Sequence, residues 1–140
     1  MFKGLAKGLG EAARMYKTSD NVEKLTVEER ERLNQIFSAA ESGNAQAMFE
    51  IATMYYNGKK LPYDPLKSVE WFEKAARSGV SSAMYNLGLL YVGNLTEAVC
   101  DNEKAIYWLQ EAIKHGYTDA ERILNQYFKL SPFTGKWKRK

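Results

Sequence analysis

Two stretches of this chain repeat one pattern: residues 47–79 read AMFEIATMYYNGKKLPYDPLKSVEWFEKAARSG, and residues 83–116 read AMYNLGLLYVGNLTEAVCDNEKAIYWLQEAIKHG. The second copy follows the first by 36 residues in its opening half and by 37 residues in its closing half. A third copy begins at Ala120 and stops. A repeat of this length is typical of arrays in which each unit packs against its neighbours.

Each copy contains two apolar stripes at helical spacing. In the first copy, Ala47, Ile51 and Tyr55 recur every four residues, and Val69 and Phe72 lie three residues apart. Side chains at these intervals share one face of a helix, so each copy is expected to be a pair of helices that need neighbours to cover them. We therefore predict an all-α chain, a short α-solenoid of stacked helix-turn-helix repeats. The expected helices span residues 27–41, 45–56, 65–77, 81–92, 102–114 and 118–129.

The ends of these helices carry capping residues. A side-chain oxygen at an N-cap accepts a hydrogen bond from the first turn, and a glycine can close a helix in the left-handed conformation. The expected N-caps are Thr26, Asp64, Asp101 and Thr118, with Glu29 and Glu121 completing capping boxes, and the closing glycines are Gly43, Gly79 and Gly116.

The repeats define the domain organisation. We expect a repeat domain at residues 27–130, made of a half repeat (27–43), two full repeats (44–79 and 80–116) and a partial repeat (117–130). The flanking segments are a basic amphipathic helix at residues 1–17, a linker at 18–26 and a basic tail at 131–140.

The positions that match between the copies carry a characteristic order of residues. In the second copy they are Ala83, Leu87, Gly88, Tyr91, Asp101, Lys104, Ala105, Trp108, Ala112 and Gly116, and in the first they are Ala47, Tyr55, Gly58, Asp64, Lys67, Trp71, Lys74, Ala75, Ala76 and Gly79. This order resembles the Sel-one-like repeat, a relative of the tetratricopeptide repeat, from about residue 30 to about residue 128. The chain departs from the family pattern at Ala52, where the pattern has Gly, at Ser68, where it has Ala, and at Asn94, where it has a loop glycine.

The resemblance implies a role as well as a fold. Small residues such as Gly88 allow helices to approach closely, while Trp71 and Trp108 fill the space between them, so the motif residues are structural. Arrays of this family look like scaffolds and adaptors for other proteins, with no chemistry of their own.

Charge is concentrated at the ends of the chain. The net charge is +3, but residues 1–17 carry +3 and residues 129–140 carry +5, which leaves −5 for the residues between them. An acidic body argues against a nucleic-acid-binding array, whereas the basic ends can touch an acidic surface. The first dozen residues lack the apolar run of a secretory signal, and no later window approaches the roughly 18 apolar residues of a membrane span. We therefore expect a cytoplasmic protein of bacterial type.

The chain has few residues that carry chemistry. Cys100 is its one cysteine and His115 its one histidine, so these residues can build neither a disulfide nor a metal site within one chain. We expect His115 to stabilise a helix C-terminus and Cys100 to be a buried or incidental thiol. No phosphate-binding glycine loop, nucleophile elbow or zinc-helix pattern occurs. These observations predict a protein that is not an enzyme, with no catalytic residues, no metal and no cofactor.

Partner binding is expected on the first helix of each helix pair. In tetratricopeptide arrays these helices line the concave side, and their side chains outside the repeat pattern are candidates for contact. The candidates are Gln46, Phe49, Thr53, Tyr56, Tyr85, Leu89, Arg122, Gln126 and Lys129. Aromatic and arginine side chains are enriched in the cores of protein interfaces. We predict an adaptor that binds a peptide or helix of another protein; cover by the N-terminal segment and self-association, as in a homodimer, are the alternatives.

The two basic ends suggest a second kind of partner. The last residues combine one tryptophan with four cations: Lys136, Trp137, Lys138, Arg139 and Lys140. Such a combination suits phosphates, acidic lipid or an acidic protein groove, although a solvated tail is the commoner state of a chain end. Residues 1–17 are expected to lie on an anionic membrane, to dock on the first repeat or to stay disordered. The alternative function is therefore tethering to a membrane surface or to nucleic acid through the basic termini.

Overall fold

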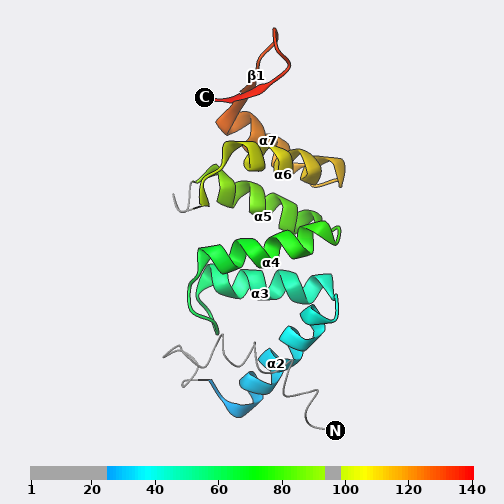
Figure 1. Ribbon diagram of the computed structural model, residues 1–140, viewed down its shortest axis with the longest axis vertical. Helices are drawn as coiled ribbons and strands as arrows, with labels where there is room; N and C mark the ends of the chain where they lie inside the picture. The colour runs from blue at the N-terminus through cyan, green and yellow to red at the C-terminus, as the bar shows by residue number, and fades with distance from the viewer. Residues whose placement is uncertain (1–24, 94–98) are drawn as a thin grey trace. The chain divides into compact units, whose positions relative to one another are not determined.

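The computed structural model of the chain describes residues 25–93 and 99–140, and these are mostly α-helical (Figure 1). The chain divides into two compact units, one ending at Ala75 and the other beginning at Ala76. The helix expected in residues 1–17 and the loop position Asn94 lie outside the described residues. Across the two described ranges, no helix has both the length and the apolar character needed to cross a membrane.

The first unit contains α2 (Val27–Glu41), α3 (Ala45–Asn57) and most of α4 (Pro65–Arg77), which run from blue to green in Figure 1. These bounds agree with the predicted helices to within one residue. The capping box predicted for α2 is confirmed. Thr26 Oγ1 accepts a hydrogen bond from the backbone N–H of Glu29 (3.1 Å), and the Glu29 carboxylate accepts one from the N–H of Thr26 (2.9 Å).

Side chains from α2, α3 and α4 form the core of the first unit. Phe37 on α2 and Trp71 on α4 meet edge to face, with ring centroids 5.9 Å apart, and Tyr55 on α3 is fully buried. The buried Ser68 hydroxyl on α4 donates a hydrogen bond to the backbone carbonyl of Ala52 on α3 (2.8 Å). The equivalent position in the second copy is Ala105, which has no hydroxyl to donate, so this bond between helices is particular to the first copy.

The second unit contains α5 (Ser81–Val92), α6 (Asn102–Lys114) and α7 (Asp119–Tyr127), followed by two short strands (Figure 1). α5 and α6 form the second full repeat, and α7 packs against both of them. Gly88 on α5 lies so near α6 that a β-carbon added there would come within 2.5 Å of the Leu109 side chain. The close approach expected at this glycine is therefore confirmed.

Three contacts recur in the two repeats and explain why one tyrosine, one aspartate and one lysine are shared by both. They are made by Tyr55, Asp64 and Lys67 in the first unit and by Tyr91, Asp101 and Lys104 in the second. The backbone N–H of the aspartate donates to the tyrosine carbonyl, at 3.0 Å in the first copy and 2.8 Å in the second. The aspartate carboxylate caps the next helix by accepting from the lysine N–H (3.0 and 3.1 Å), as predicted for both aspartates. The lysine ammonium lies over the tyrosine ring, 5.5 and 5.4 Å from its centroid.

Glycine residues end the helices where the sequence predicts. Gly43, Gly79 and Gly116 have φ values of 98°, 93° and 86°, in the left-handed region. Gly58 and Gly93 end α3 and α5 in the same way. The family pattern has its loop glycine at the position of Asn94. In the second copy the glycine that ends α5 is instead Gly93, one residue earlier.

The capping box predicted at the start of the last helix is wrong. Thr118 has helical backbone angles (φ −66°, ψ −28°), and its side chain accepts no capping hydrogen bond. The turn between α6 and α7 is short, because the N–H of Tyr117 donates to Ala112 O (2.9 Å) and the N–H of Ala120 donates to Tyr117 O (3.2 Å). An N-cap hydroxyl reaches the first turn from an extended residue, and this tight turn leaves no such residue.

The end of the chain also differs from the prediction. The helix predicted at residues 118–129 ends at Tyr127, and the residues expected to form a tail instead contribute to an antiparallel hairpin of β1 (Phe128–Leu130) and β2 (Trp137–Arg139). Phe128 is extended (φ −128°, ψ 155°), yet its side chain is buried. The ring thus keeps the buried position that the helical pattern assigned to it, although the backbone has left the helix.

Candidate interaction surface

The predicted contact residues of the first unit lie in a row along α3. Gln46 is exposed, whereas Phe49, Thr53 and Tyr56 are half-buried. The Phe49 ring meets Phe72 edge to face with centroids 5.5 Å apart, and the Thr53 hydroxyl donates to Phe49 O (2.9 Å). Burial raises the pKa of Tyr56, with a smaller contribution from Tyr63. Part of this row therefore belongs to the packing of its own unit.

A shallow hollow of about 340 Å³ lies between α2 and α3. Arg32, Gln35 and Ile36 line it from α2, and Gln46 and Glu50 line it from α3. Of the predicted contact residues, Gln46 alone borders this hollow. The hollow is therefore separate from the aromatic part of the α3 row.

In the second unit, four predicted contact residues lie on two first helices that pack against each other, α5 and α7. Tyr85 and Leu89 on α5 are half-buried, and Arg122 and Gln126 on α7 are exposed. The Tyr85 ring stacks on Tyr117, which precedes α7, with centroids 4.7 Å apart and planes inclined by 29°. The structure therefore brings these residues onto one pair of helices, while the α3 row forms a separate candidate surface in the first unit.

Of the side chains that the structure describes, the most exposed large apolar ones lie outside both candidate surfaces. They are Val27, Tyr63, Leu66, Tyr107, Leu130 and Phe133. The candidate rings on α3 and α5 are instead partly covered by their own unit. Their assignment to partner binding stays a prediction.

Lys129 and the basic residues near the chain end occupy the hairpin. Lys129 lies in β1 opposite Lys138, not on the last helix where it was predicted, because the chain turns extended at Phe128. Trp137 is half-buried and lines a hollow of about 470 Å³ with residues of α6 and α7 such as Ile113.

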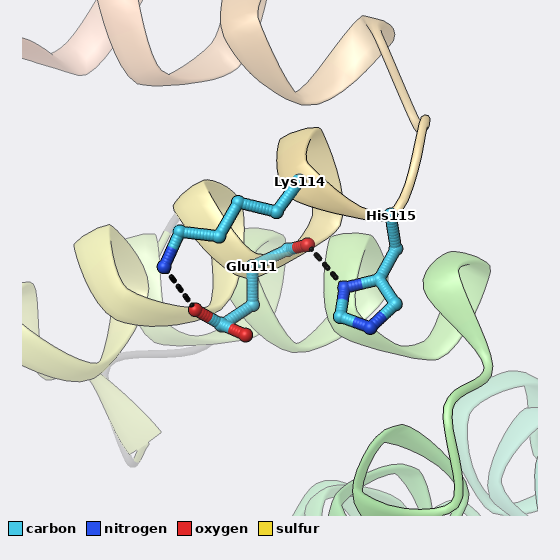
Figure 2. A network of polar contacts seen from close by, with 3 residues as sticks. All are labelled: Glu111, Lys114 and His115. Carbon is cyan, nitrogen blue, oxygen red and sulfur yellow. Dashed lines mark hydrogen bonds and ion pairs between the residues drawn. The ribbon is translucent and has the colours of Figure 1, made fainter.

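His115 lies at the C-terminus of α6, as predicted (Figure 2). Its Nδ1 is 2.9 Å from the backbone oxygen of Glu111, whose carboxylate pairs with Lys114 at 2.7 Å. The hydrogen bond to Glu111 raises the pKa of Lys114. Cys100 is exposed, not buried, with its Sγ 3.8 Å from Val92 O. Among residues 25–93 and 99–140, no three His, Cys, Asp or Glu side chains are grouped to hold a metal ion.

Two apolar residues of the hairpin were not among the predicted site residues. Leu130 and Phe133 are 51% and 95% exposed. The sequence does contain a pattern that could have indicated their exposure. Two short runs, FKL and WKR, flank a turn with Pro132 and Gly135. Such a pattern is typical of a hairpin with a longer loop, whose tip exposes its side chains.

The family model of the Sel1 repeat matches residues 45–80 and 81–117, which together are just over half of the chain. Two curated relatives share part of this sequence. The alginate biosynthesis protein AlgK of Azotobacter vinelandii is 37% identical over 78 residues, which cover 56% of this chain and 16% of AlgK. Chitin synthase regulatory factor 4 of Schizosaccharomyces pombe is 31% identical over 88 residues, which cover 61% of this chain and 13% of that protein. The chain thus spans less than a fifth of the length of either relative.

Solved structures agree with the helical repeat fold. A Sel1 repeat protein from Oxalobacter formigenes superposes with a TM-score of 0.60 at 34% identity, covering 65% of this chain and 26% of the other. A protective antigen of uropathogenic Escherichia coli with a Sel1-like repeat fold matches with a TM-score of 0.59 at 24% identity, over 87% of this chain and 25% of its own. The resemblance drawn from the repeated residues is confirmed, and this chain belongs to the Sel1 repeat family.

Proposed function

We propose that this chain is an adaptor that binds a peptide or helix of another protein on the first helices of its repeats. Sel1 repeat proteins are generally scaffolds for protein–protein interaction and are generally not catalytic. The observation that carries the proposal is that α5 and α7 pack together and present side chains outside the repeat pattern. These side chains are Tyr85, Leu89, Arg122 and Gln126.

The four side chains offer three kinds of contact. Tyr85 is held by its stack on Tyr117, so little rotational freedom is lost when its ring contacts a partner. Half-buried Leu89 extends this apolar contact. Arg122 and Gln126 are exposed, and a guanidinium can bind a carboxylate through two hydrogen bonds while an amide can pair with a peptide backbone. The surface therefore suits a short segment that carries an aromatic or aliphatic side chain beside an acidic one.

Affinity capture with the full chain from the cytoplasmic fraction, the compartment we propose, followed by mass spectrometry tests this function. The double variant Arg122→Ala, Gln126→Ala removes exposed side chains and should leave the fold intact. We expect it to lower partner recovery about tenfold if these residues lie at the centre of the interface. The matched control Arg77→Ala, Gln35→Ala removes the same two side-chain types from exposed positions on α4 and α2 and should recover the partner as the unmodified chain does.

Unchanged recovery with the α7 variant contradicts the proposal, as does equal loss with the control variant on α4 and α2. Capture of this chain alone, with a molecular mass that rises with concentration in light scattering, assigns the surface to self-association. Phe49→Ala and Tyr85→Ala are less suitable tests, because both rings pack within their own units and their loss also changes stability.

A further inference from the structure

The β1–β2 hairpin has two sides of different chemistry. Directly opposite residues of an antiparallel pair share a side, and neighbours along a strand alternate between the two sides. The register pairs Phe128 with Arg139, Lys129 with Lys138 and Leu130 with Trp137. One side, the aromatic side, therefore carries Phe128, Trp137 and Arg139 together with Leu130, and the other carries lysines.

The aromatic side is held by the helices of the second unit. Phe128 is buried, and Trp137 is half-buried beside α6 and α7. The Arg139 guanidinium donates to Val92 O at the end of α5 (2.8 Å) and to Asn102 Oδ1 at the start of α6 (3.0 Å). The Lys140 ammonium also donates to the backbone oxygen of Asn125 on α7 (2.5 Å), so the hairpin is held by its aromatic side and by its last residue.

The other side is a cluster of like charges. Lys129 and Lys138 are directly opposite each other and exposed, and by alternation Lys136 continues the same side. The sequence contains no Asp or Glu after Glu121, and within the described part of the chain no acidic residue pairs with these three lysines. Like charges placed opposite each other destabilise a strand pair. An anionic partner would relieve this repulsion.

The loop of the hairpin adds an apolar tip to this cluster. Ser131 N–H donates to Lys136 O (2.8 Å) and Gly135 N–H donates to Ser131 O (2.9 Å), which closes a tight loop around Phe133. Phe133 is 95% exposed, and Figure 1 shows the loop projecting away from the helices of its unit. An exposed ring at a projecting tip next to lysines is typical of a segment that enters the interface of a membrane.

We propose that the hairpin attaches the protein to an anionic lipid surface, with the lysines against the headgroups and Phe133 at the tip in the acyl boundary. Two observations favour lipid over nucleic acid. Arg139, which could bind a phosphate through two hydrogen bonds, is turned toward the helices, and Trp137, the best ring for stacking on a base, is half-buried. Pro132 beside the tip has no aromatic ring to stack on a base, but it fits an acyl layer.

Sedimentation of the full chain with vesicles tests this attachment. We expect binding to phosphatidylcholine vesicles that contain phosphatidylserine, weak binding to phosphatidylcholine alone, and loss of binding at high salt. Each lysine near an anionic surface strengthens attachment about fivefold, so Lys129→Thr with Lys138→Thr should weaken it about 25-fold. Threonine suits a strand, and the change removes a repulsion, so the hairpin should remain folded. Phe133→Ser should weaken binding about tenfold on vesicles with phosphatidylserine.

The loop between α3 and α4 offers matched controls. Lys59→Ser with Lys60→Asn removes the same charge from exposed positions, with asparagine at Lys60 because its φ is 65°. Tyr63→Ser removes a ring that is 57% exposed. Both controls should bind vesicles as the unmodified chain does. The proposal is overturned if the chain does not bind the anionic vesicles, if the hairpin variants bind as the controls do, or if the hairpin variants lose binding only to a single-stranded oligonucleotide.

Discussion

Gly88→Ala should destabilise the second unit, although alanine is normally the better helix residue. A β-carbon at this position would lie 2.5 Å from both Cγ and Cδ2 of Leu109, whereas carbon atoms in contact are normally about 3.5–4.0 Å apart. Leu109 is fully buried, so its side chain can move only against other packed atoms. The glycine is therefore explained by the close approach of α5 and α6.

Two opposing effects decide the size of the change. Overpacking of a core destabilises by about 1–3 kcal/mol, and the upper half of that range applies because Cγ is not a flexible end of the side chain. Replacing glycine by alanine inside a helix stabilises by about 1 kcal/mol. The expected net loss for Gly88→Ala is therefore about 1–2 kcal/mol in the free energy of unfolding, measured by urea titration of the helical circular dichroism.

A second background separates the two effects. Leu109→Ala alone should cost about 2–5 kcal/mol, because it leaves a cavity in the core. In that background the added methyl group at Gly88 meets no leucine, so Gly88→Ala should now stabilise by up to about 1 kcal/mol. The same substitution is thus expected to change sign with the residue that faces it. If Gly88→Ala instead stabilises the unmodified chain by about 1 kcal/mol, or has the same sign in both backgrounds, the close-approach explanation fails.

The first repeat supplies the reverse experiment. Ala52 occupies the position equivalent to Gly88 and is fully buried with its methyl group in place. Ala52→Gly should lose about 1 kcal/mol of helix propensity and the burial of one methyl group, for a total of about 1–2 kcal/mol. Each copy should therefore prefer its own residue.

Two further predictions concern pH and capping. Tyr55 has its pKa raised to about 12 by burial first and by Asp64 and Glu70 second, so between pH 10 and 12 the unfolded chain releases a proton that the folded chain keeps. Stability should be complete below pH about 10 and fall by about 2–3 kcal/mol by pH about 12; in Tyr55→Phe, urea titrations across this range should show a shallower fall. At the caps, Thr26→Ala should lower the stability of the first unit by about 1 kcal/mol, whereas Thr118→Ala should change stability by less than about 0.5 kcal/mol, since Thr118 makes no capping bond. Equal losses at the two threonines in thermal unfolding would contradict this reading of the last helix.

Helix limits could be predicted closely wherever the residue that ends a helix acts locally. Asp101 caps α6 through its own carboxylate, and Gly116 follows the same helix in the left-handed conformation. Each limit of α6 is therefore set by a residue whose type and position can be read from the sequence. Thr118 and Glu121 have the spacing of a capping box, but the short turn from α6 sets the backbone angles of Thr118. The spacing of two residues does not indicate how tight the preceding turn is.

The hairpin could not be predicted from periodicity for a different reason. Ala120, Leu124 and Phe128 recur every four residues, which is a helical pattern, and all three are buried in the structure. Periodicity reports which residues are buried, and Phe128 is buried equally well from an extended backbone. Pro132 and Gly135, which are typical of turns, were the residues that indicated a turn after the helix. The sequence identified the basic residues at the end as candidate binding residues. It did not predict the strand pairing, which places Lys138 and Arg139 on opposite sides of the hairpin.

The repeats also constrain the kind of partner that the proposed surface can hold. The tyrosine, aspartate and lysine contacts recur with nearly equal distances in the two copies, so the framework is the same in both. The side chains at equivalent positions outside that framework are not the same. Within the second unit, Tyr85 on α5 and Arg122 on α7 occupy one such position, and Leu89 and Gln126 occupy the next. A partner with a repeating sequence would meet different chemistry on α5 and on α7, so the surface of the second unit is better matched to a single segment whose own residues change along its length.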